Sequence, residues 1–555
     1  MAPISLIDRT PSAYGYPLLI KQLLKTPLVH APKQEIVYRE LKRFNYTTLA
    51  ERIGRLANAL ESLGVGPGDT IGVMDWDSHR YLECYFAIPM MGAVLHTVNI
   101  RLSPEQILYT INHAEDDVLL VHADFLPVLK EIRRDLTSVR KIILLTDTET
   151  PPVSELGIAD EYESLLEKSP VEYDFPDFDE NAKATTFYTT GTTGSPKGVY
   201  FSHRQLVLHT LSVLGSLAGY STKGGFNSRD VYMPLTPMFH VHAWGMPYIA
   251  TLLGVKQVYP GRYMPDNILN LVKTEKVTFS HCVPTILHML LNSPAASATD
   301  LSNWKVIIGG SALSKGLCRA AMEKGINVFT GYGMSETCPI LTIAGFKPHM
   351  TNLNSERELE IRCRTGVPVP LVDLKLVDPQ GREQPHDGSS VGEVVVRSPW
   401  LTQGYFREEK RSEELWREGY LHTEDIGFID EEGYLQVTDR IKDVIKTGGE
   451  WISSLQIEDI LTQHQAVSEA AAIGIPDEKW GERPVAFVVL KPSYIGKITE
   501  DDLKTFFKEF VTRGSISKWG IPDSIVIIDK LPKTSVGKLD KKKLRSGNLR
   551  PGLRT

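Results

Sequence analysis

The sequence predicts an α/β fold in which a large N-terminal domain of several subdomains, residues 1–440, precedes a small C-terminal α/β domain, residues 441–555. Three observations support this prediction. The chain of 555 residues is longer than the roughly 250–300 residues at which one hydrophobic core stops growing, so two or three domains are expected. Helix-like and strand-like hydrophobic patterns alternate along most of the chain, which is typical of α/β layers. The charged segment Asp439–Lys442 separates a last group of elements from the rest.

The elements of the large domain follow from hydrophobic periodicity. Residues Tyr46–Leu63 predict a helix that opens at Thr47, because apolar side chains recur there at every third or fourth position. Short apolar and β-branched runs predict strands at Thr70–Met74, Ile142–Leu145, Thr185–Thr189 and Val231–Leu235. The acidic, proline-broken stretch Asp174–Asn181 predicts a surface loop.

The small domain is predicted from the elements beyond Arg440. The helix expected there is Asp501–Phe510, and the expected strands are Val467–Ile475, Val485–Leu490 and Ser524–Ile528. These elements are enough for an α/β domain of ordinary size.

Composition excludes several classes of protein. Hydrophobic residues at 42% and charged residues at 23% are ordinary for a globular chain, which excludes a fibrous or disordered one. The net charge of −7 gives no general attraction for nucleic acid. The five cysteines are widely spaced without a Cys-x-x-Cys pair, which favours reduced thiols in the cytoplasm over disulfides or a zinc site.

No export or membrane-spanning segment is expected. The first residues lack a basic stretch followed by an apolar run, and no run of eighteen apolar residues occurs. The segment Gly245–Val255 is too short to cross a bilayer and is predicted to lie in the core. The basic tail that begins at Lys533 is predicted to be a solvated chain end.

The most informative stretch is a loop rich in glycine and threonine after the strand Thr185–Thr189. Glycines let backbone amides approach an anion, hydroxyls add donors and a lysine supplies charge, so the loop suits a nucleotide triphosphate. It is no Walker A motif, because Pro196 precedes the lysine and Gly198 follows it. A helix is expected after Ser202. The candidate nucleotide-binding residues of the loop are Thr189, Thr190, Gly191, Thr192, Thr193, Gly194 and Lys197.

The run Tyr188-Thr-Thr-Gly-Thr-Thr-Gly-Ser-Pro-Lys-Gly198 closely resembles the phosphate loop of the adenylate-forming ligases. This superfamily includes acyl-CoA synthetases, luciferases and the adenylation domains of peptide synthetases. The resemblance extends from Tyr46 to Lys541, with further motifs in the expected order. It implies a large adenylation domain, a small mobile C-terminal domain, and the use of ATP, Mg²⁺ and coenzyme A. A homodimer is common among such relatives.

A second motif, Thr330-Gly-Tyr-Gly-Met-Ser-Glu-Thr337, resembles the next signature of this family. Tyr332 offers an aromatic face for adenine, and Glu336 is a hard oxygen ligand that by resemblance shares Mg²⁺ with Thr189. By the same resemblance Thr337 bonds an α-phosphate oxygen. The nucleotide-binding residues implied in this motif are Gly331, Tyr332, Gly333 and Thr337.

The run Tyr420-Leu-His-Thr-Glu-Asp-Ile-Gly427 carries Asp425, which by resemblance accepts hydrogen bonds from both ribose hydroxyls. The family usually has glycine where this chain has Glu424. The segment Thr438–Ser453 resembles the one that joins the two domains of the family. The implied roles in it are a ribose or phosphate contact for Arg440, a hinge at Lys442 and a pantetheine channel at Gly448 and Gly449.

The last motif, Leu531-Pro-Lys-Thr-Ser-Val-Gly-Lys-Leu-Asp540, places Lys538 where the family has its catalytic lysine. A flexible ammonium can follow negative charge as it moves from the attacking carboxylate to the leaving pyrophosphate. None of the cysteines is assigned a role as nucleophile.

The acyl site is expected around Pro237–Pro247. By resemblance His240 lies beside the reacting carboxylate, with a catalytic role, and binds the acyl group together with Trp244, Gly309 and Gly310. The His-x-x-x-Trp spacing looks most like bacterial medium- and long-chain fatty acyl-CoA synthetases, some of which gate a fatty-acid tunnel with an aromatic residue. It also resembles methylthiopropionate ligases, so Trp244 either gates a tunnel or floors a short pocket.

The resemblance therefore implies ATP-dependent ligation of a carboxylic acid to coenzyme A. The first candidate for this acid is a medium- or long-chain fatty acid. A short-chain or methylthiopropionate-type ligase is the first alternative. The others are an adenylation module that charges a carrier protein, a luciferase-type oxygenase and a non-catalytic sensor of AMP or acyl-adenylate. The expected partners are the acid, ATP and coenzyme A, and no nucleic acid.

Overall fold

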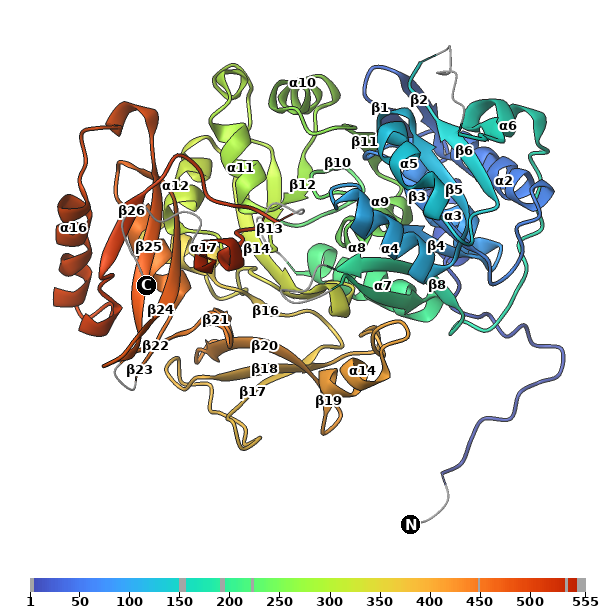
Figure 1. Ribbon diagram of the computed structural model, residues 1–555. Helices are drawn as coiled ribbons and strands as arrows, with labels where there is room; N and C mark the ends of the chain where they lie inside the picture. The colour runs from blue at the N-terminus through green and yellow to red at the C-terminus, as the bar shows by residue number, and fades with distance from the viewer. Residues whose placement is uncertain are drawn as a thin grey trace.

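The computed structural model describes residues 4–148, 156–189, 195–220, 224–447, 450–534 and 538–546. These residues form two large sheets flanked by helices, a smaller third sheet and a C-terminal unit with a sheet of its own (Figure 1). The predicted α/β class, with a large N-terminal and a small C-terminal part, is confirmed.

A nine-stranded sheet carries one wall of the site. Its strand order is β16, β15, β14, β13, β12, β10, β11, β1 and β2, and the strands from β14 to β1 run parallel. The strands are β1 (Glu35–Tyr38), β2 (Lys42–Asn45), β10 (Val231–Pro234), β11 (Lys256–Tyr259), β12 (Phe279–Cys282), β13 (Lys305–Ile308), β14 (Asn327–Gly333), β15 (Ile340–Ile343) and β16 (Val367–Pro368). The carboxyl ends of parallel strands meet at one edge, where α/β folds bind ligands.

A seven-stranded sheet carries the facing wall, in the order β7, β6, β5, β3, β4, β8 and β9. Its strands are β3 (Thr70–Met74), β4 (Val94–Thr97), β5 (Asp116–His122), β6 (Lys141–Leu145), β7 (Asp160–Glu161), β8 (Lys183–Thr189) and β9 (Lys197–Ser202). The predicted strands of this sheet are confirmed. Its last two strands, β8 and β9, pair antiparallel.

The helix predicted after Ser202 is confirmed, but the strand β9, which lies between the glycine-rich loop and this helix, was not predicted. The loop joins two strands, β8 and β9, and Lys197 is the first residue of β9. The expected helix, α7 (His203–Gly219), begins only after β9, where the Ser202 hydroxyl caps it by accepting a hydrogen bond from Gln205 N. Because β9 separates the loop from α7, the N-terminus of α7, with its positive dipole end, does not directly follow the loop. Residues Thr190, Gly191, Thr192, Thr193 and Gly194 lie outside the described residues.

Helices cover both faces of the two large sheets. The largest hydrophobic cluster joins side chains of both sheets to α2, α3, α7 and α9, so the sheets pack across these helices. Helices α10 to α13 cover the other face of the nine-stranded sheet, and α4 and α5 cover that of the seven-stranded sheet. Besides α7, the helices of the large domain are α1 (Lys21–His30), α2 (Tyr46–Ser62), α3 (His79–Met90), α4 (Pro104–Ala114), α5 (Leu126–Ile132), α6 (Tyr162–Lys168), α8 (Val241–Trp244), α9 (Met246–Leu253), α10 (Pro265–Glu275), α11 (Pro284–Leu291), α12 (Lys315–Glu323), α13 (Ser355–Cys363) and α14 (Glu409–Leu415).

Helix α2 ends within one residue of its prediction, but the predicted opening residue is wrong. The side chain of Asn45, not Thr47, caps the helix by accepting a hydrogen bond of 3.0 Å from Thr48 N. Asn45 ends β2 with extended backbone angles, φ −117° and ψ 178°, which is the conformation that an N-cap residue needs.

A short linker after β21 connects the third sheet to the C-terminal domain. The third sheet holds β17 (Asp373–Val377), β18 (Gly392–Arg397), β19 (Trp416–Arg417), β20 (Tyr420–Ile429) and β21 (Leu435–Arg440). The C-terminal domain holds β22 (Ile445–Thr447), β23 (Glu450–Ile452), β24 (Val467–Asp477), β25 (Gly481–Leu490), β26 (Ser524–Ile527), α15 (Ser454–Thr462), α16 (Glu500–Thr512) and α17 (Lys541–Arg545). The chain thus passes from one sheet to the next between β21 and β22, and the division at residue 441 stays a prediction.

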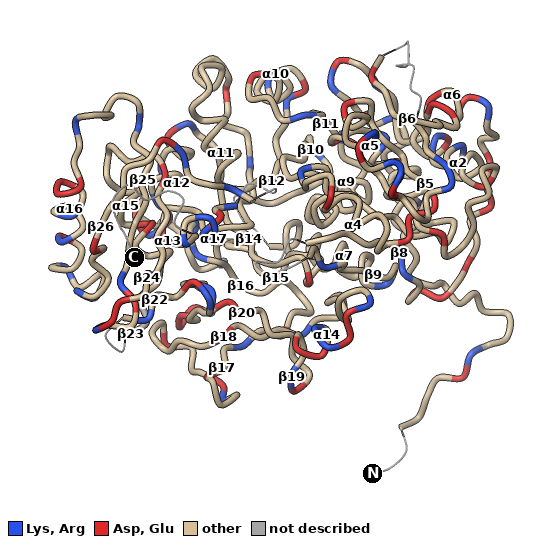
Figure 2. Tube along the Cα trace, in the orientation of Figure 1, with Lys and Arg blue, Asp and Glu red and all other residues tan. Residues whose placement is uncertain are grey.

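The basic tail is exposed at Lys542 and Lys543, as its charge predicts, but not at Lys541. Basic residues gather in α17 (Figure 2), where Lys541 is largely buried and forms an ion pair of 2.7 Å with Glu458. Arg545 pairs with Asp443 of the linker at 2.7 Å. These two ion pairs hold α17 against the start of its own domain.

A search of the described helices for one long and apolar enough to span a bilayer found none. The segment Gly245–Val255 forms α9, whose residues from Met246 to Thr251 are buried, as predicted for a core segment.

Candidate active site

A cavity of about 2970 Å³ lies between the large domain and the C-terminal domain. The carboxyl ends of β8, β13 and β14 open into it from the large domain, and the segment before α17 enters it from the C-terminal domain. The predicted site residues that line this cavity are Thr189, Lys197, His240, Gly310, Gly331, Tyr332, Gly333, Glu336, Asp425, Arg440, Lys442 and Lys538. Motifs separated by up to 350 positions in the chain are therefore brought to one cleft.

Three predicted residues, Gly309, Trp244 and Thr337, are instead buried behind the cavity wall. Thr337 has no exposed surface, and its hydroxyl donates to the carbonyl of Pro339. The Thr337 side chain thus does not line the cavity, and its bond to an α-phosphate oxygen stays a prediction. The two glycines expected to line the pantetheine channel, Gly448 and Gly449, lie outside the described residues.

The predicted phosphate-binding residues Thr189 and Lys197 lie at the base of the β8–β9 hairpin. Thr189 and Lys197 are paired across this base, so one backbone unit presents a hydroxyl and an ammonium to the cavity. Lys197 Nζ lies 4.4 Å from the centre of the Tyr405 ring, a cation–π contact.

The residues predicted to bind the nucleoside are grouped around the carboxylate of Asp425 in β20. Tyr332 donates its hydroxyl proton to Asp425 Oδ2 at 2.8 Å, and Arg440 Nε donates to Oδ1 at 3.0 Å. A carboxylate has about four acceptor positions, so these two bonds leave capacity for a further pair of hydroxyls. Burial and Asp425 raise the pKa of Tyr332 well above its usual value, which keeps its hydroxyl a donor.

Glu424 occupies the position at which the family usually has glycine. Its φ is +59°, in the left-handed region that glycine adopts without cost. Glu424 keeps this conformation with its carbonyl accepting from Ile441 N at 2.9 Å. The departure from the family pattern therefore leaves the strand residue beside Asp425 in a glycine-like conformation.

The carboxylate of Glu336 fits a magnesium ion held through phosphates. It belongs to a short turn, Ser335–Thr337, and accepts a hydrogen bond of 2.7 Å from the Tyr405 hydroxyl. The described residues contain no group of three or more acidic, histidine or cysteine side chains suited to a metal. Mg²⁺ is usually bound by one or two carboxylates together with substrate phosphates and water, which a single carboxylate in the cavity that Thr189 also lines matches.

Lys538 is the charged group that the C-terminal domain contributes. Its pKa is lowered to about 8 by burial and by the Arg440 charge, while Asp425 and Glu336 act in the opposite direction. The ammonium charge is thus present at neutral pH and is lost as the pH rises above 8. A Cβ at Gly310, whose φ is +78°, would lie 3.1 Å from Lys538 Cε, so the glycine makes room for the lysine.

His240 faces the same cavity at the start of the acyl segment. Burial, followed by the charges of Lys538 and Arg101, lowers its pKa to about 3, so the imidazole is neutral at physiological pH. A neutral imidazole beside an attacking carboxylate can donate or accept one hydrogen bond without adding charge.

Helix α8, after His240, is a left-handed turn. All four residues from Val241 to Trp244 have φ between +47° and +61°, a conformation that costs roughly 1–2 kcal/mol per residue. The turn presses Trp244 against His281 and against Gly309, where a Cβ would lie 2.9 Å from the indole ring. Gly309 therefore shapes the acyl site by admitting Trp244.

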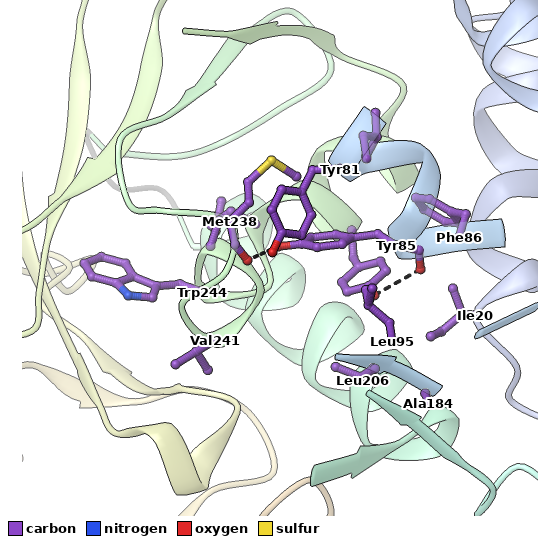
Figure 3. Close-up of a cluster of buried hydrophobic side chains, with 14 of the residues drawn as sticks. Ile20, Tyr81, Tyr85, Phe86, Leu95, Ala184, Leu206, Met238, Val241 and Trp244 are labelled. Atoms are coloured by element: carbon purple, nitrogen blue, oxygen red, sulfur yellow. Dashed lines mark hydrogen bonds between the residues drawn. The ribbon is translucent and has the colours of Figure 1, made fainter. Parts of the chain in front are cut away.

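Two side chains that sequence reasoning missed hold the backbone just before this turn. Asp77 accepts a hydrogen bond of 2.8 Å from Met238 N, and the Tyr85 hydroxyl donates to the Met238 carbonyl (Figure 3). Both peptide groups of Met238 are thereby fixed. Tyr405, which contacts Glu336 and Lys197, was missed as well. No motif spacing in the sequence identifies Tyr405, and its position directly after Gly404 is the one signal that could have pointed to it.

Comparison with known proteins places these features in context. A family model described as AMP-binding enzyme matches residues 26–406, and one described as AMP-binding enzyme C-terminal domain matches residues 456–538. The chain is 41% identical to a long-chain-fatty-acid–CoA ligase of Thermus thermophilus over 92% of each chain. It is 38% identical to a 3-methylmercaptopropionyl-CoA ligase of Ruegeria lacuscaerulensis, over 95% of this chain and 97% of that one. The solved structure of an anthranilate CoA ligase with bound anthranoyl-AMP superposes with a TM-score of 0.83 at 26% identity, covering 95% of this chain and 97% of that one.

Proposed function

The chain belongs to the AMP-binding enzyme family, and from this premise we propose that it joins a carboxylic acid to coenzyme A through an acyl-adenylate. In the first half-reaction a carboxylate oxygen attacks the α-phosphorus of ATP. The bond to the bridging oxygen breaks, and pyrophosphate leaves. In the second, the thiol of coenzyme A loses its proton and attacks the acyl carbonyl, and AMP leaves with the bonding electrons.

The observation that carries this proposal is the convergence of Lys538, Glu336 and Asp425 in one cavity. These charged side chains come from three separate motifs, and the two carboxylates act on the pKa of the lysine. Such a group of charges suits a polyphosphate whose negative charge moves during the reaction. No nucleophile from the protein is required.

The residues around the nucleotide have distinct proposed roles. Asp425 accepts hydrogen bonds from the ribose hydroxyls, while Tyr332 and Arg440 orient its carboxylate. Lys538 balances charge on the α-phosphate as the carboxylate attacks. The Glu336 carboxylate and the Thr189 hydroxyl would hold Mg²⁺, which supplies charge neutralisation on the phosphates when bound.

The second half-reaction requires the C-terminal domain to turn about Lys442, so that Lys538 withdraws and the Gly448–Gly449 segment approaches. Polar contacts between the domains would have to break. Asp439 accepts from Ser454 N at 2.6 Å, Asp459 accepts from Lys315 N at 3.1 Å, and His288 bonds the Ser468 hydroxyl at 3.0 Å. In the proposed cycle, the arrangement with Lys538 in the cleft is the one that forms the adenylate.

The proposed acid is a medium- or long-chain fatty acid, as the similarity to the Thermus ligase suggests. A short acid of the methylthiopropionate type is the second candidate. One observation favours it: Trp244 is only 6% exposed and fills the space between Gly309 and His281. A long chain would need the indole to move.

The test of the acid is AMP release with ATP, Mg²⁺ and coenzyme A across straight-chain acids from acetate to palmitate. A rate that peaks at octanoate or longer is expected if Trp244 moves aside. A peak between propionate and hexanoate, with palmitate inert, would replace the fatty-acid proposal with the short-acid one. No release with any acid would overturn the ligase proposal.

A homodimer and a cytoplasmic location are further proposals. Sedimentation of the purified chain and fractionation of the source cells would test them.

A further inference from the structure

One loop, Thr402–Phe406, connects the two halves of the proposed phosphate and metal site. The amide of Thr402 donates to the Glu336 carbonyl at 2.9 Å, and the Tyr405 hydroxyl donates to Glu336 Oε1 at 2.7 Å. The backbone and the side chain of Glu336 are therefore both held by this loop.

The same loop is attached to the strand that carries Lys197. Phe406 N donates to the Gly198 carbonyl at 2.8 Å, and Tyr405 forms an antiparallel bridge with Val199. The Thr402 hydroxyl donates to the carbonyl of Tyr200 at 3.1 Å. The loop thus runs alongside β9 and fixes the backbone of the first residues of this strand relative to Glu336.

Tyr405 is the residue at which the two attachments meet. Its ring lies 4.4 Å beneath Lys197 Nζ, while its hydroxyl binds Glu336. The side chain is buried, and burial together with Glu336 raises its pKa far above the usual value, so it remains a neutral donor.

The loop itself has little freedom to move. Tyr405 N donates to the Ser412 hydroxyl at 2.8 Å, and a Cβ at Gly404 would lie 2.4 Å from that hydroxyl. Gln205 Nε2 donates to the Leu401 carbonyl at 2.6 Å. Such support is what keeps a functional carboxylate in a fixed position.

We propose that Tyr405 is a positioning residue that sets the Glu336 carboxylate and the Lys197 ammonium at a fixed separation, so that metal and nucleotide are bound as one unit. This inference rests on the proposed function, because that function assigns Glu336 to Mg²⁺ and Lys197 to the phosphates. Tyr405 does not react with substrate. It holds the two groups that contact the metal and the polyphosphate.

The test is the variant Tyr405→Phe, which keeps the ring beneath Lys197 and removes the hydroxyl. Binding of Mn²⁺ in the presence of a non-hydrolysable ATP analogue, followed by electron paramagnetic resonance, should weaken by about tenfold to a hundredfold, the range for a hydrogen bond to a charged group. Binding of the metal-free analogue should stay unchanged. Tyr405→Leu removes the ring as well and should weaken binding of the metal-free analogue too.

Tyr434→Phe is the matched control. Tyr434 is also buried and donates to the Gly345 carbonyl at 2.7 Å, but it does not line the cavity. The Tyr434→Phe variant should bind Mn²⁺ and the ATP analogue as the wild type does.

The outcomes separate this inference from the proposed function. Equal Mn²⁺ affinity in wild type and Tyr405→Phe would overturn the inference and leave the function standing. Parallel loss of metal-bound and metal-free nucleotide in Tyr405→Phe would overturn it also, because a general distortion would then explain the loss. Absence of any Mn²⁺–nucleotide binding by the wild type would instead overturn the proposed function.

Discussion

Replacement of Lys538 by alanine is expected to slow acyl-adenylate formation by about a hundredfold to a thousandfold, the range measured when one preorganised donor to a developing charge is removed. The ammonium lies in the cleft between the charges of Glu336 and Asp425, where it can stabilise charge that develops on the α-phosphate. Thioester formation from supplied acyl-adenylate should remain near the wild-type rate, because the proposed domain rotation withdraws Lys538 for that step. Single-turnover measurements of the two half-reactions give both rates.

The control for this variant is Lys543→Ala, which removes a largely exposed lysine of the same C-terminal segment. It should leave both half-reactions unchanged. Equal losses in the two half-reactions of Lys538→Ala would contradict the proposed division of roles between the domain positions.

The second large effect is expected from Asp425→Ala, which should raise the KM for ATP by about a hundredfold or more, since two hydrogen bonds to a charged group are lost. Tyr332 and Arg440 would also lose the carboxylate that they contact. Comparison of ATP with 2′-deoxy-ATP tests the role directly. The wild type should prefer ATP, and the variant should lose that preference.

Glu424→Gly is the matched control for Asp425→Ala. It changes the adjacent residue at a φ of +59°, which glycine adopts freely, and the KM for ATP should stay within about twofold of wild type since no nucleotide contact is removed. Equal use of ATP and 2′-deoxy-ATP by the wild type would show that Asp425 does not bind the ribose as proposed.

Helices and strands with a strong hydrophobic pattern could be predicted from the sequence, whereas their tertiary contacts could not. Strand β3 covers Thr70–Met74 as predicted, because an apolar run bounded by turn residues has few alternatives. Strand β9, Lys197–Ser202, was missed because it begins within the glycine-rich loop and holds Gly198. Its pairing with β8 comes from tertiary structure.

Buried charges and strained turns also lay beyond sequence reasoning. Lys541 stands in a run of lysines that predicts solvent exposure, but its partner Glu458 is 83 positions earlier. The turn Val241–Trp244 contains no glycine or asparagine, so nothing in it indicates a left-handed backbone. The motif residues of the cleft could be named from resemblance, whereas Tyr405 became visible only through its contacts with Glu336 and Lys197.

The measurement that tests the central claim most directly is acid-dependent exchange of labelled pyrophosphate into ATP by the wild type, with Mg²⁺ and without coenzyme A. An acyl-adenylate that forms reversibly in the cleft predicts exchange that requires the acid and does not require coenzyme A. Exchange that is absent for every acid accepted in the AMP-release assay, or that appears only when coenzyme A is added, would contradict an adenylate intermediate.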